Sequence, residues 1–238
     1  MKAMILAAGF GTRLRPLTDR IPKPLIDIGG KPLVLHIIDQ LKQAQITEIV
    51  INLHYLGGQI QAVLGDGTAF GVHITYSEEP EILGTGGGVK RAQPWLGDAP
   101  FLIFNGDILT DLPLTTLIDF HRQQSVISTL AVREPRRNQQ PTVRVQGNRV
   151  IDLREQLGNT APHSALMHGM GIMICEPLVF QYLTPTFSDI ITTFHLPALR
   201  DRQAIGAFIY DGYWNDIGTP EALTAARKHY ARYHPHLC

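Results

Sequence analysis

The sequence predicts an α/β fold: a mostly parallel, mixed sheet with helices on both faces. Two observations support this prediction. Short apolar and β-branched segments alternate with segments whose apolar residues recur at helical spacing, which is typical of parallel strands joined by crossover helices. The chain of 238 residues is also 44% hydrophobic, which suffices for the core of a single domain over residues 1–238.

The first half of the chain shows this alternation clearly. Residues 33–41 repeat apolar side chains at helical spacing, whereas residues 48–53 form a compact β-branched segment. The expected order is a strand at 4–8, a helix at 33–41, a strand at 48–53, a short helix at 59–64, a strand at 72–76, a helix at 86–96 and a strand at 101–104. Because ligands bind beyond the carboxyl ends of such strands, the loop at 9–11 and the turn at 105–107 should converge.

The second half of the chain adds antiparallel character. Residues 142–145 and 149–153 flank a Gln-Gly-Asn turn with β-like side chains, as a hairpin does. The remaining expected elements are a helix at 112–123, strands at 126–132, 170–174 and 204–210, a helix at 188–199 capped by Ser188, and a last helix from Thr219 to about Tyr233.

The charge balance gives no global electrostatic field. Lysine and arginine together number 21, and so do aspartate and glutamate together. No global field therefore draws the chain to nucleic acid or to an anionic membrane. No segment approaches the roughly 20 apolar residues of a membrane span. Cys175 and Cys238 form neither a disulfide framework nor a zinc spacing, and together these features predict a soluble protein of the reducing cytoplasm.

A glycine loop follows the first predicted strand. Gly9 and Gly11 can take positive φ angles and let phosphates approach backbone N–H groups, while Arg13, Arg15 and Lys23 place cations nearby. The loop therefore predicts a polyanion site. It is not a P-loop, because G-x-x-x-x-G-K-[ST] is absent, and it is not a dinucleotide fingerprint, because a leucine stands where the third glycine belongs.

The segment LAAGFGTRL at 6–14, with PLT at 16–18 and PKPL at 22–25, resembles the signature of the sugar-phosphate nucleotidyltransferases, or nucleotide-sugar pyrophosphorylases. Members join a nucleoside triphosphate to a sugar 1-phosphate and release pyrophosphate. The resemblance implies a Rossmann-like fold of the nucleotide-diphospho-sugar transferase type, with Arg13 and Lys23 as catalytic cations on the triphosphate and its leaving group. The implied nucleotide contacts are Leu6, Ala7, Ala8, Gly9, Gly11 and Thr12.

A second glycine segment, LGTGGG at 83–88, opens a predicted helix. Its glycines should bring bare N–H groups and a helix N-terminus together, which suits a base or an anion. The segment is similar to a family loop that contacts the base and the sugar, which implies contacts from Gly84, Thr85 and Gly86. The TGGG form most resembles the N-acetylmuramate 1-phosphate uridylyltransferases of bacterial cell-wall recycling. Because Leu-Gly-Thr also occurs in mannose- and heptose-phosphate guanylyltransferases, the base stays open.

Two acidic turns predict a metal site. Asp107 follows the strand at 101–104, and a hard cation such as Mg²⁺ is usually held by one or two carboxylates plus substrate phosphates. The family carries a metal-binding aspartate at this position, and WNDIGTP at 214–220 resembles its Trp-x-Asp-x-Gly-Thr-Pro motif. The resemblance thus implies Mg²⁺ as the cofactor, held by Asp107 and Asp216.

The acceptor side departs from the family pattern. Many relatives carry Glu-Lys-Pro where this chain has Glu155 and Gln156, so the lysine that binds the sugar phosphate is missing. Either Arg154 or a basic residue from elsewhere replaces it, or the phosphate is held differently, and this departure argues against a glucose 1-phosphate thymidylyltransferase. Asn105 and Glu155 are expected to contact the acceptor, and Gly171 would leave room for the sugar.

The expected activity is Mg²⁺-dependent transfer of a nucleoside monophosphate from a triphosphate, with UTP favoured, to a sugar 1-phosphate such as N-acetylmuramate 1-phosphate. The alternative is a mannose- or heptose-1-phosphate guanylyltransferase. Molybdenum-cofactor nucleotidyltransferases and choline-phosphate cytidylyltransferases share the glycine-loop opening, but the segments at 83–88 and 214–220 favour a sugar acceptor. A regulatory subunit that has lost catalysis is the non-enzyme alternative, and the intact basic and acidic residues argue against it. We expect the two substrates as the only partners of a monomer or small homo-oligomer.

Overall fold

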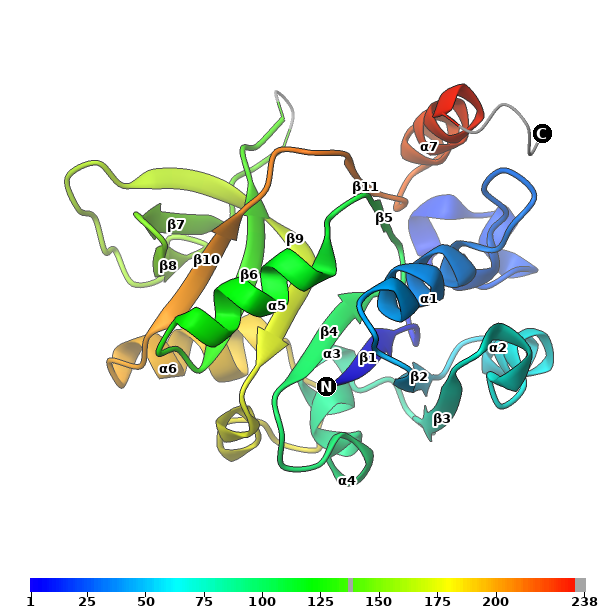
Figure 1. Ribbon diagram of the computed structural model, residues 1–238, viewed down its shortest axis with the longest axis horizontal. Helices are drawn as coiled ribbons and strands as arrows, with labels where there is room; N and C mark the ends of the chain where they lie inside the picture. Colours follow the sequence, from blue (N-terminus) through cyan, green and yellow to red (C-terminus); the bar gives the residue numbers. More distant parts are fainter. Residues whose placement is uncertain (137–138, 234–238) are drawn as a thin grey trace.

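The computed structural model describes residues 1–136 and 139–233, so Arg137 and Cys238 lie outside the described residues. Its main sheet has the strand order β3-β2-β1-β4-β9-β6-β10-β8-β7, with helices on both faces (Figure 1). The strands are β1 Lys2–Leu6, β2 Glu48–Leu53, β3 His73–Glu78, β4 Phe101–Asn105, β5 Ile108–Thr110, β6 Ser128–Arg133, β7 Val143–Gln146, β8 Arg149–Leu153, β9 Ala165–Cys175, β10 Ile205–Ile209 and β11 Trp214–Asp216. The α-helices are α1 Leu33–Gln43, α2 Gly57–Leu64, α3 Gly84–Arg91, α4 Gln93–Leu96, α5 Leu114–Gln123, α6 Leu196–Arg200 and α7 Pro220–Tyr233.

The first four strands of the chain are parallel, as the sequence predicts. β1 pairs in parallel with β2 and β4, and β2 pairs with β3. β9 runs antiparallel between β4 and β6, and the predicted hairpin of β7 and β8 extends the sheet beside β10. The predicted fold class is therefore confirmed. The carboxyl ends of β1 to β4 lie at one edge of the sheet, where ligands of such folds bind.

Both faces of the central strands are buried. In β1, Ala3 and Ile5 belong to the core cluster of α1, α2 and α5, whereas Met4 belongs to the cluster that contains Val89 of α3 and Phe194 before α6. Figure 1 shows α1 and α5 crossing one face of the sheet. Because successive side chains of a strand point to opposite faces, a strand covered on both sides needs an uninterrupted apolar sequence.

A third, smaller core holds α7 against the segment that follows β1. Leu14 of that segment clusters with Leu223 of α7 and with Ile217 next to β11. β11 pairs antiparallel with β5, which brings Asp216 opposite Ile108. The C-terminal helix thereby fixes β11 beside the turn that follows β4.

The predicted helix at 86–96 has the wrong bounds. The structure begins α3 earlier, at Gly84, and separates it from α4 at Ala92. Pro94 has no N–H to continue the hydrogen-bond ladder of a helix, which accounts for the break.

The predicted cap at Ser188 is wrong as well. The carboxylate of Asp189 accepts the N–H groups of Ile191 and Thr192, at 2.8 and 3.2 Å. A π-helical turn at Ile191–His195 then leads into α6. Pro197 lacks the N–H that a regular α-helix would need there, so the chain forms a wider turn before it.

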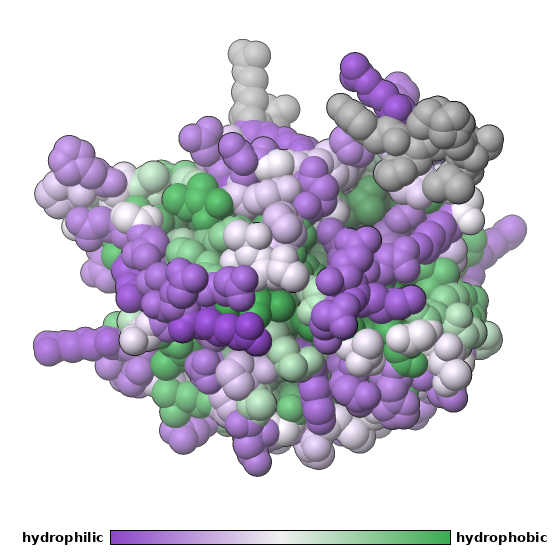
Figure 2. All heavy atoms as spheres, in the orientation of Figure 1, coloured by the Kyte–Doolittle hydropathy of each residue, from purple (hydrophilic) through white to green (hydrophobic). Residues whose placement is uncertain are grey.

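Figure 2 shows hydrophilic side chains over most of one face of the molecule, with apolar ones between them. In the described part of the chain, no helix combines the length and apolarity that a membrane crossing requires. Cys175 is buried, and burial raises the pKa of its thiol to about 12, which makes the thiol unreactive. The single domain and the cytoplasmic location stay predictions.

Replacing Phe101 by alanine should test the buried side of the sheet. The ring is fully buried and stacks on Phe180, with ring centroids 5.3 Å apart. We expect Phe101→Ala to lower the free energy of unfolding by about 3–5 kcal/mol in chemical denaturation, because it leaves a cavity. Phe187→Ala is the control: this ring is 72% exposed, so a change within about 0.5 kcal/mol is expected. Equal effects of the two changes would contradict this account of the core.

Candidate active site

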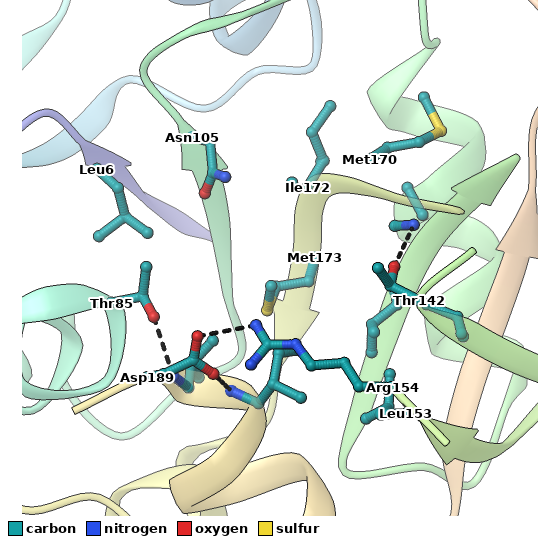
Figure 3. Close-up of a pocket in the computed structure, with 17 residues that line it drawn as sticks. Leu6, Thr85, Asn105, Thr142, Leu153, Arg154, Met170, Ile172, Met173 and Asp189 are labelled. Atoms are coloured by element: carbon teal, nitrogen blue, oxygen red, sulfur yellow. Dashed lines mark hydrogen bonds and ion pairs between the residues drawn. The ribbon is translucent and has the colours of Figure 1, made fainter. Parts of the chain in front are cut away.

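Two adjoining pockets lie at the carboxyl ends of the parallel strands. The first, named the loop pocket, is lined by Leu6, Ala8, Gly9, Asn52, Ile82, Gly84, Thr85, Asn105 and Asp107. The second, named the β9 pocket, is lined by five residues of β9 and two of β6, together with residues of other segments that include Arg154 and Asp189 (Figure 3). Leu6, Thr85 and Asn105 line both pockets, so a ligand in one lies next to a ligand in the other.

The glycine loop owes its shape to packing as well as to open space. Gly11 has φ +66°, and a Cβ there would lie 2.9 Å from Thr18 Cγ2 and 3.1 Å from Lys23 Cγ. The Thr18 hydroxyl donates to the Gly11 carbonyl at 2.8 Å, which folds the segment after the loop back onto it. A Cβ on Gly9, in contrast, would meet nothing within 4 Å. Gly9 therefore leaves the pocket open, whereas Gly11 makes room for Lys23.

Two cations and two carboxylates gather beside this loop. Lys23 Nζ donates to Asp107 Oδ2 at 2.8 Å. Arg13 and Asp216 both lie against Gly218, where a Cβ would be 2.5 Å from Arg13 Nη2 and 2.9 Å from Asp216 Oδ1. Burial and the nearby Asp107 carboxylate raise the pKa of Asp216, while Lys23 and Arg13 oppose the rise. The sequence-predicted residues of both acidic turns and of the glycine loop thus meet in one place.

Asp107 and Asp216 fit a divalent cation. Among the described residues, Asp216 Oδ1 is a buried atom without a hydrogen-bond partner, and a cation would supply one. Within the same residues, no group of three or more histidine, cysteine, aspartate or glutamate side chains could hold a metal by itself. A pair of carboxylates suits a cation that takes its other ligands from substrate phosphates, as Mg²⁺ does.

Sequence reasoning missed two buried residues that join the sides of the loop pocket. Asn52 Oδ1 accepts the Ala7 N–H at 2.7 Å, and Asn52 Nδ2 donates to Glu79 Oε1 at 2.8 Å. Glu79 Oε2 accepts the Leu83 N–H at 2.8 Å. We name this chain of hydrogen bonds the Asn52–Glu79 bridge. Asn52 and Glu79 are polar residues near the carboxyl ends of the predicted parallel strands at 48–53 and 72–76, which could have indicated them.

The glycines of the LGTGGG segment pack against the chain before α6. A Cβ on Gly86 would lie 2.6 Å from Ser188 Oγ, and Gly86 donates its N–H to the Ser188 carbonyl at 2.9 Å. The expectation of bare N–H groups is therefore wrong at Gly86, because a segment distant in sequence uses this donor. Thr85 Oγ1 accepts the Ile190 N–H at 2.9 Å, which holds the same segment at the wall of the β9 pocket.

The β9 pocket is built around a left-handed glycine. Gly171 has φ +72°, and a Cβ there would lie 2.6 Å from Asn105 Nδ2. The register between β6 and β9 shifts between Leu130 and Val132, opposite this part of β9. Trp214 Nε1 donates to the Met170 carbonyl at 2.8 Å, so β11 is fixed to the same strand.

Arg154 and Asp189 face each other at one end of the β9 pocket (Figure 3). Arg154 Nη2 lies 2.9 Å from Asp189 Oδ2. Glu155 points elsewhere: it pairs with Arg144 at 3.0 Å and lines neither pocket. The acceptor contact expected of Glu155 stays a prediction.

Comparison with known proteins identifies the family. The sequence profile described as nucleotidyl transferase matches residues 2–233. The chain belongs to the nucleotidyl transferase family. This membership confirms the resemblance carried by the glycine loop and by the Trp214 motif.

This nucleotidyl transferase family member is similar to curated proteins that carry different names. It is 60% identical over 116 residues to the N-acetylmuramate alpha-1-phosphate uridylyltransferase of Neisseria meningitidis, across 48% of this chain and 50% of that protein. It is 36% identical over 234 residues to the mannose-1-phosphate guanyltransferase of Yarrowia lipolytica, across 93% of this chain and 61% of that protein. The chain thus spans about half to three fifths of the length of these curated relatives.

A solved structure shares the fold. A putative glucose-1-phosphate thymidylyltransferase from Bacillus anthracis superposes with a TM-score of 0.80 at 24% identity, over 96% of this chain and 94% of that chain. At this identity the likeness concerns the fold alone, and it confirms the predicted nucleotide-diphospho-sugar transferase type.

Alanine at Gly171 should test the shape of the β9 pocket. The change forces a side chain into a left-handed conformation and against Asn105, so we expect Gly171→Ala to lower the free energy of unfolding by at least about 1 kcal/mol. Gly169→Ala on the same strand is the control, since its Cβ would make ordinary contacts at 3.6 Å and beyond. Denaturation curves that place both variants at the same stability would refute the assigned role of Gly171.

Proposed function

We propose that this chain is a sugar-1-phosphate nucleotidyltransferase, which transfers a nucleoside monophosphate from a nucleoside triphosphate to a sugar 1-phosphate. One observation carries the proposal. Arg13 and Lys23 come from the segment after β1, Asp107 and Asp216 come from two distant turns, and the four charges act on one another at the edge of the loop pocket. Two cations and two carboxylates in one place suit a triphosphate that binds together with a divalent cation.

The two pockets divide the substrates between them. The loop pocket would take the triphosphate and its base, and the adjoining β9 pocket would take the sugar. An oxygen of the acceptor phosphate attacks the α-phosphorus, and the bond from that phosphorus to the bridging oxygen of the β-phosphate breaks, so pyrophosphate leaves with the electron pair. Because the acceptor phosphate is already an anion, no side chain has to remove a proton from it.

The charged side chains have separate tasks in this step. Arg13 and Lys23 hold phosphate oxygens of the nucleotide and stabilise the departing pyrophosphate. Asp107 and Asp216 would hold Mg²⁺, which neutralises charge on the phosphate oxygens when it is bound. The backbone at Gly9 leaves the space through which the phosphates approach the loop.

The acceptor phosphate needs a cation in place of the lysine that is absent at Gln156. Among the described residues that line the β9 pocket, Arg154 supplies that charge, and we assign it this contact. Its ion pair with Asp189 keeps the guanidinium at the pocket, and the two side chains are 43% and 42% exposed. Exposed ion pairs contribute at most about 1 kcal/mol, so a phosphate can compete for Arg154.

UTP and N-acetylmuramate 1-phosphate are the favoured substrates. The relative with 60% identity over 116 residues is named a uridylyltransferase, whereas the relative matched over 93% of the chain at 36% identity is named a guanyltransferase. We give the higher identity more weight. Mannose or heptose 1-phosphate with GTP is the alternative pair.

Removing either metal-binding carboxylate should abolish most of the turnover. We expect Asp107→Asn and Asp216→Asn to fold and to lose roughly a hundredfold or more of the Mg²⁺-dependent rate, because each change removes a negatively charged ligand. Pyrophosphate release at a fixed Mg²⁺ concentration measures this loss.

Asp119→Asn is the matched control for these variants. Asp119 lies on α5, its side chain is 64% exposed, and its ion-pair partner is Arg122 on the same helix. The control should keep the wild-type rate. Near-wild-type rates at low Mg²⁺ in both Asp107→Asn and Asp216→Asn would show that the metal assignment is wrong.

A substrate screen should identify the base and the sugar. We expect UTP to support turnover with N-acetylmuramate 1-phosphate, or a related hexose 1-phosphate, better than GTP, dTTP or CTP does. A pocket whose buried donors and acceptors match uracil rejects guanine, because those groups would be left unpaired. The measurement is pyrophosphate release from each of the four triphosphates with a panel of sugar 1-phosphates.

The outcomes of the screen distinguish the assignment of the substrates from the assignment of the reaction type. Preference for GTP with mannose or heptose 1-phosphate would overturn the uridylyl assignment and leave the reaction type in place. If no combination of nucleotide and sugar 1-phosphate in the panel released pyrophosphate, the result would count against the proposed reaction itself.

A further inference from the structure

We infer that Asn52 and Glu79 are positioning residues, which hold the two sides of the loop pocket at a fixed separation and thereby set its affinity for a nucleotide. The inference rests on the proposed function in one respect, namely that a nucleotide binds in this pocket. Its basis is the Asn52–Glu79 bridge, which runs from the Ala7 N–H through both side chains to the Leu83 N–H.

The ends of the bridge lie in two different segments that line the pocket. Ala7 stands between two residues that line the loop pocket on the β1 side, and Leu83 stands between two lining residues on the α3 side. Asn52 itself lines the pocket between them. A change in the bridge would therefore move pocket walls directly, without an intermediate element.

The bridge is buried, and each of its hydrogen-bond donors faces an acceptor. Asn52 is 2% exposed and Glu79 is 3% exposed. Both oxygens of Glu79 accept from N–H donors, so the side chain acts as a carboxylate whose charge is satisfied by hydrogen bonds. A buried carboxylate is tolerated only with such partners, so loss of one partner would displace the other groups.

The strands do not need the bridge for their own pairing. β2 and β3 already pair in parallel along their whole length, from Glu48 opposite His73 to Leu53 opposite Glu78. Asn52 belongs to this ladder through its backbone, opposite Ser77, whereas its side chain bonds to groups outside the β2–β3 pairing: the Ala7 N–H after β1 and the Glu79 carboxylate after β3. The contribution of the bridge is thus to the loops that form the pocket, rather than to the sheet.

The last glycine of the LGTGGG segment supports the same assignment. A Cβ on Gly88 would lie 2.7 Å from Glu79 Oε1 and 3.0 Å from Asn52 Nδ2. Helix α3 therefore approaches the central hydrogen bond of the bridge more closely than any side chain would permit. Gly88 leaves space for the bridge, in contrast to Gly86, which leaves space for Ser188.

The test reverses the direction of the central hydrogen bond. In Glu79→Gln, the introduced amide nitrogen faces another donor, and in Asn52→Asp two carboxylates face each other. In the double variant Asn52→Asp/Glu79→Gln, the introduced glutamine donates to the introduced aspartate and still accepts from Leu83, while the aspartate still accepts from Ala7. Every partner is then satisfied, and the net charge equals that of the wild type.

The readout is direct nucleotide binding. Isothermal titration calorimetry gives the dissociation constants of the magnesium complexes of UTP and GTP, and thermal melting is followed in parallel. We expect each single variant to weaken binding by about tenfold or more, because a buried polar group loses its partner. The double variant should recover most of the affinity. A merely structural role would lower the melting temperature of the single variants without this loss of affinity.

Glu78→Gln is the matched control. Glu78 is the neighbour of Glu79 and is exposed, and its side chain accepts a surface hydrogen bond from Gln61 at 3.0 Å. The same substitution at this position should leave nucleotide affinity unchanged. Equal losses in Glu78→Gln and Glu79→Gln would overturn the inference.

Other outcomes decide the inference as well. It is overturned if the folded single variants bind nucleotide as the wild type does, or if the double variant binds no better than either single one. Should Glu79→Gln not fold, Gly88→Ala keeps both polar partners and crowds them, so it should weaken binding by a similar factor, and unchanged binding would refute the bridge. A wild-type protein that binds either nucleotide but turns over no sugar 1-phosphate would end the proposed function, and the variants would still decide this inference. A wild-type protein that binds neither nucleotide would overturn both.

Discussion

The site depends on the ion pair between Lys23 and Asp107, whose charged atoms lie 2.8 Å apart. Lys23 comes from the segment after β1, and Asp107 comes from the turn after β4, so the pair ties two strand ends together. Its side chains are only 14% and 25% exposed, which limits screening by salt and solvent. Because Lys23 packs on Gly11, and Thr18 of the same segment donates to the Gly11 carbonyl, the shape of the glycine loop and the position of the carboxylate are set jointly.

Two neighbouring carboxylates at a buried edge require opposite charges around them. Asp107 and Asp216 repel each other, and Arg13 and Lys23 offset that repulsion. The polypeptide that carries Asp216 is held in turn by Trp214, whose indole N–H donates to the Met170 carbonyl. One hydrogen bond therefore joins the strand that carries Asp216 to the strand that lines the β9 pocket. The aromatic residue of the motif connects β11 to β9 through this hydrogen bond.

Glycines of the two loops and of β9 serve different physical purposes, although they look alike in the sequence. Gly9 leaves open space, whereas Gly86 and Gly171 prevent overlap with Ser188 and Asn105. Sequence patterns predict that these glycines belong to a substrate site, because they stand in segments that resemble motifs of the family. They could not separate ligand approach from packing, because the atoms that a Cβ would meet come from segments far along the chain.

By itself the sequence determined the parallel α/β core, the hairpin, the glycine loop and the acidic turns, because periodicity and turn chemistry act over a few neighbouring residues. Only the tertiary structure decided that Asp189, rather than Ser188, caps the turn before α6, that Arg154 meets Asp189, and that Asn52 meets Glu79. The cap at Asp189 is a local contact, next to a Ser188 whose backbone is bonded to Leu83 and Gly86. The other two contacts require polar atoms from two separate elements to come within hydrogen-bond distance. The distance between such atoms is set by strand register and by the packing of helices on the sheet, which no local pattern of residues encodes.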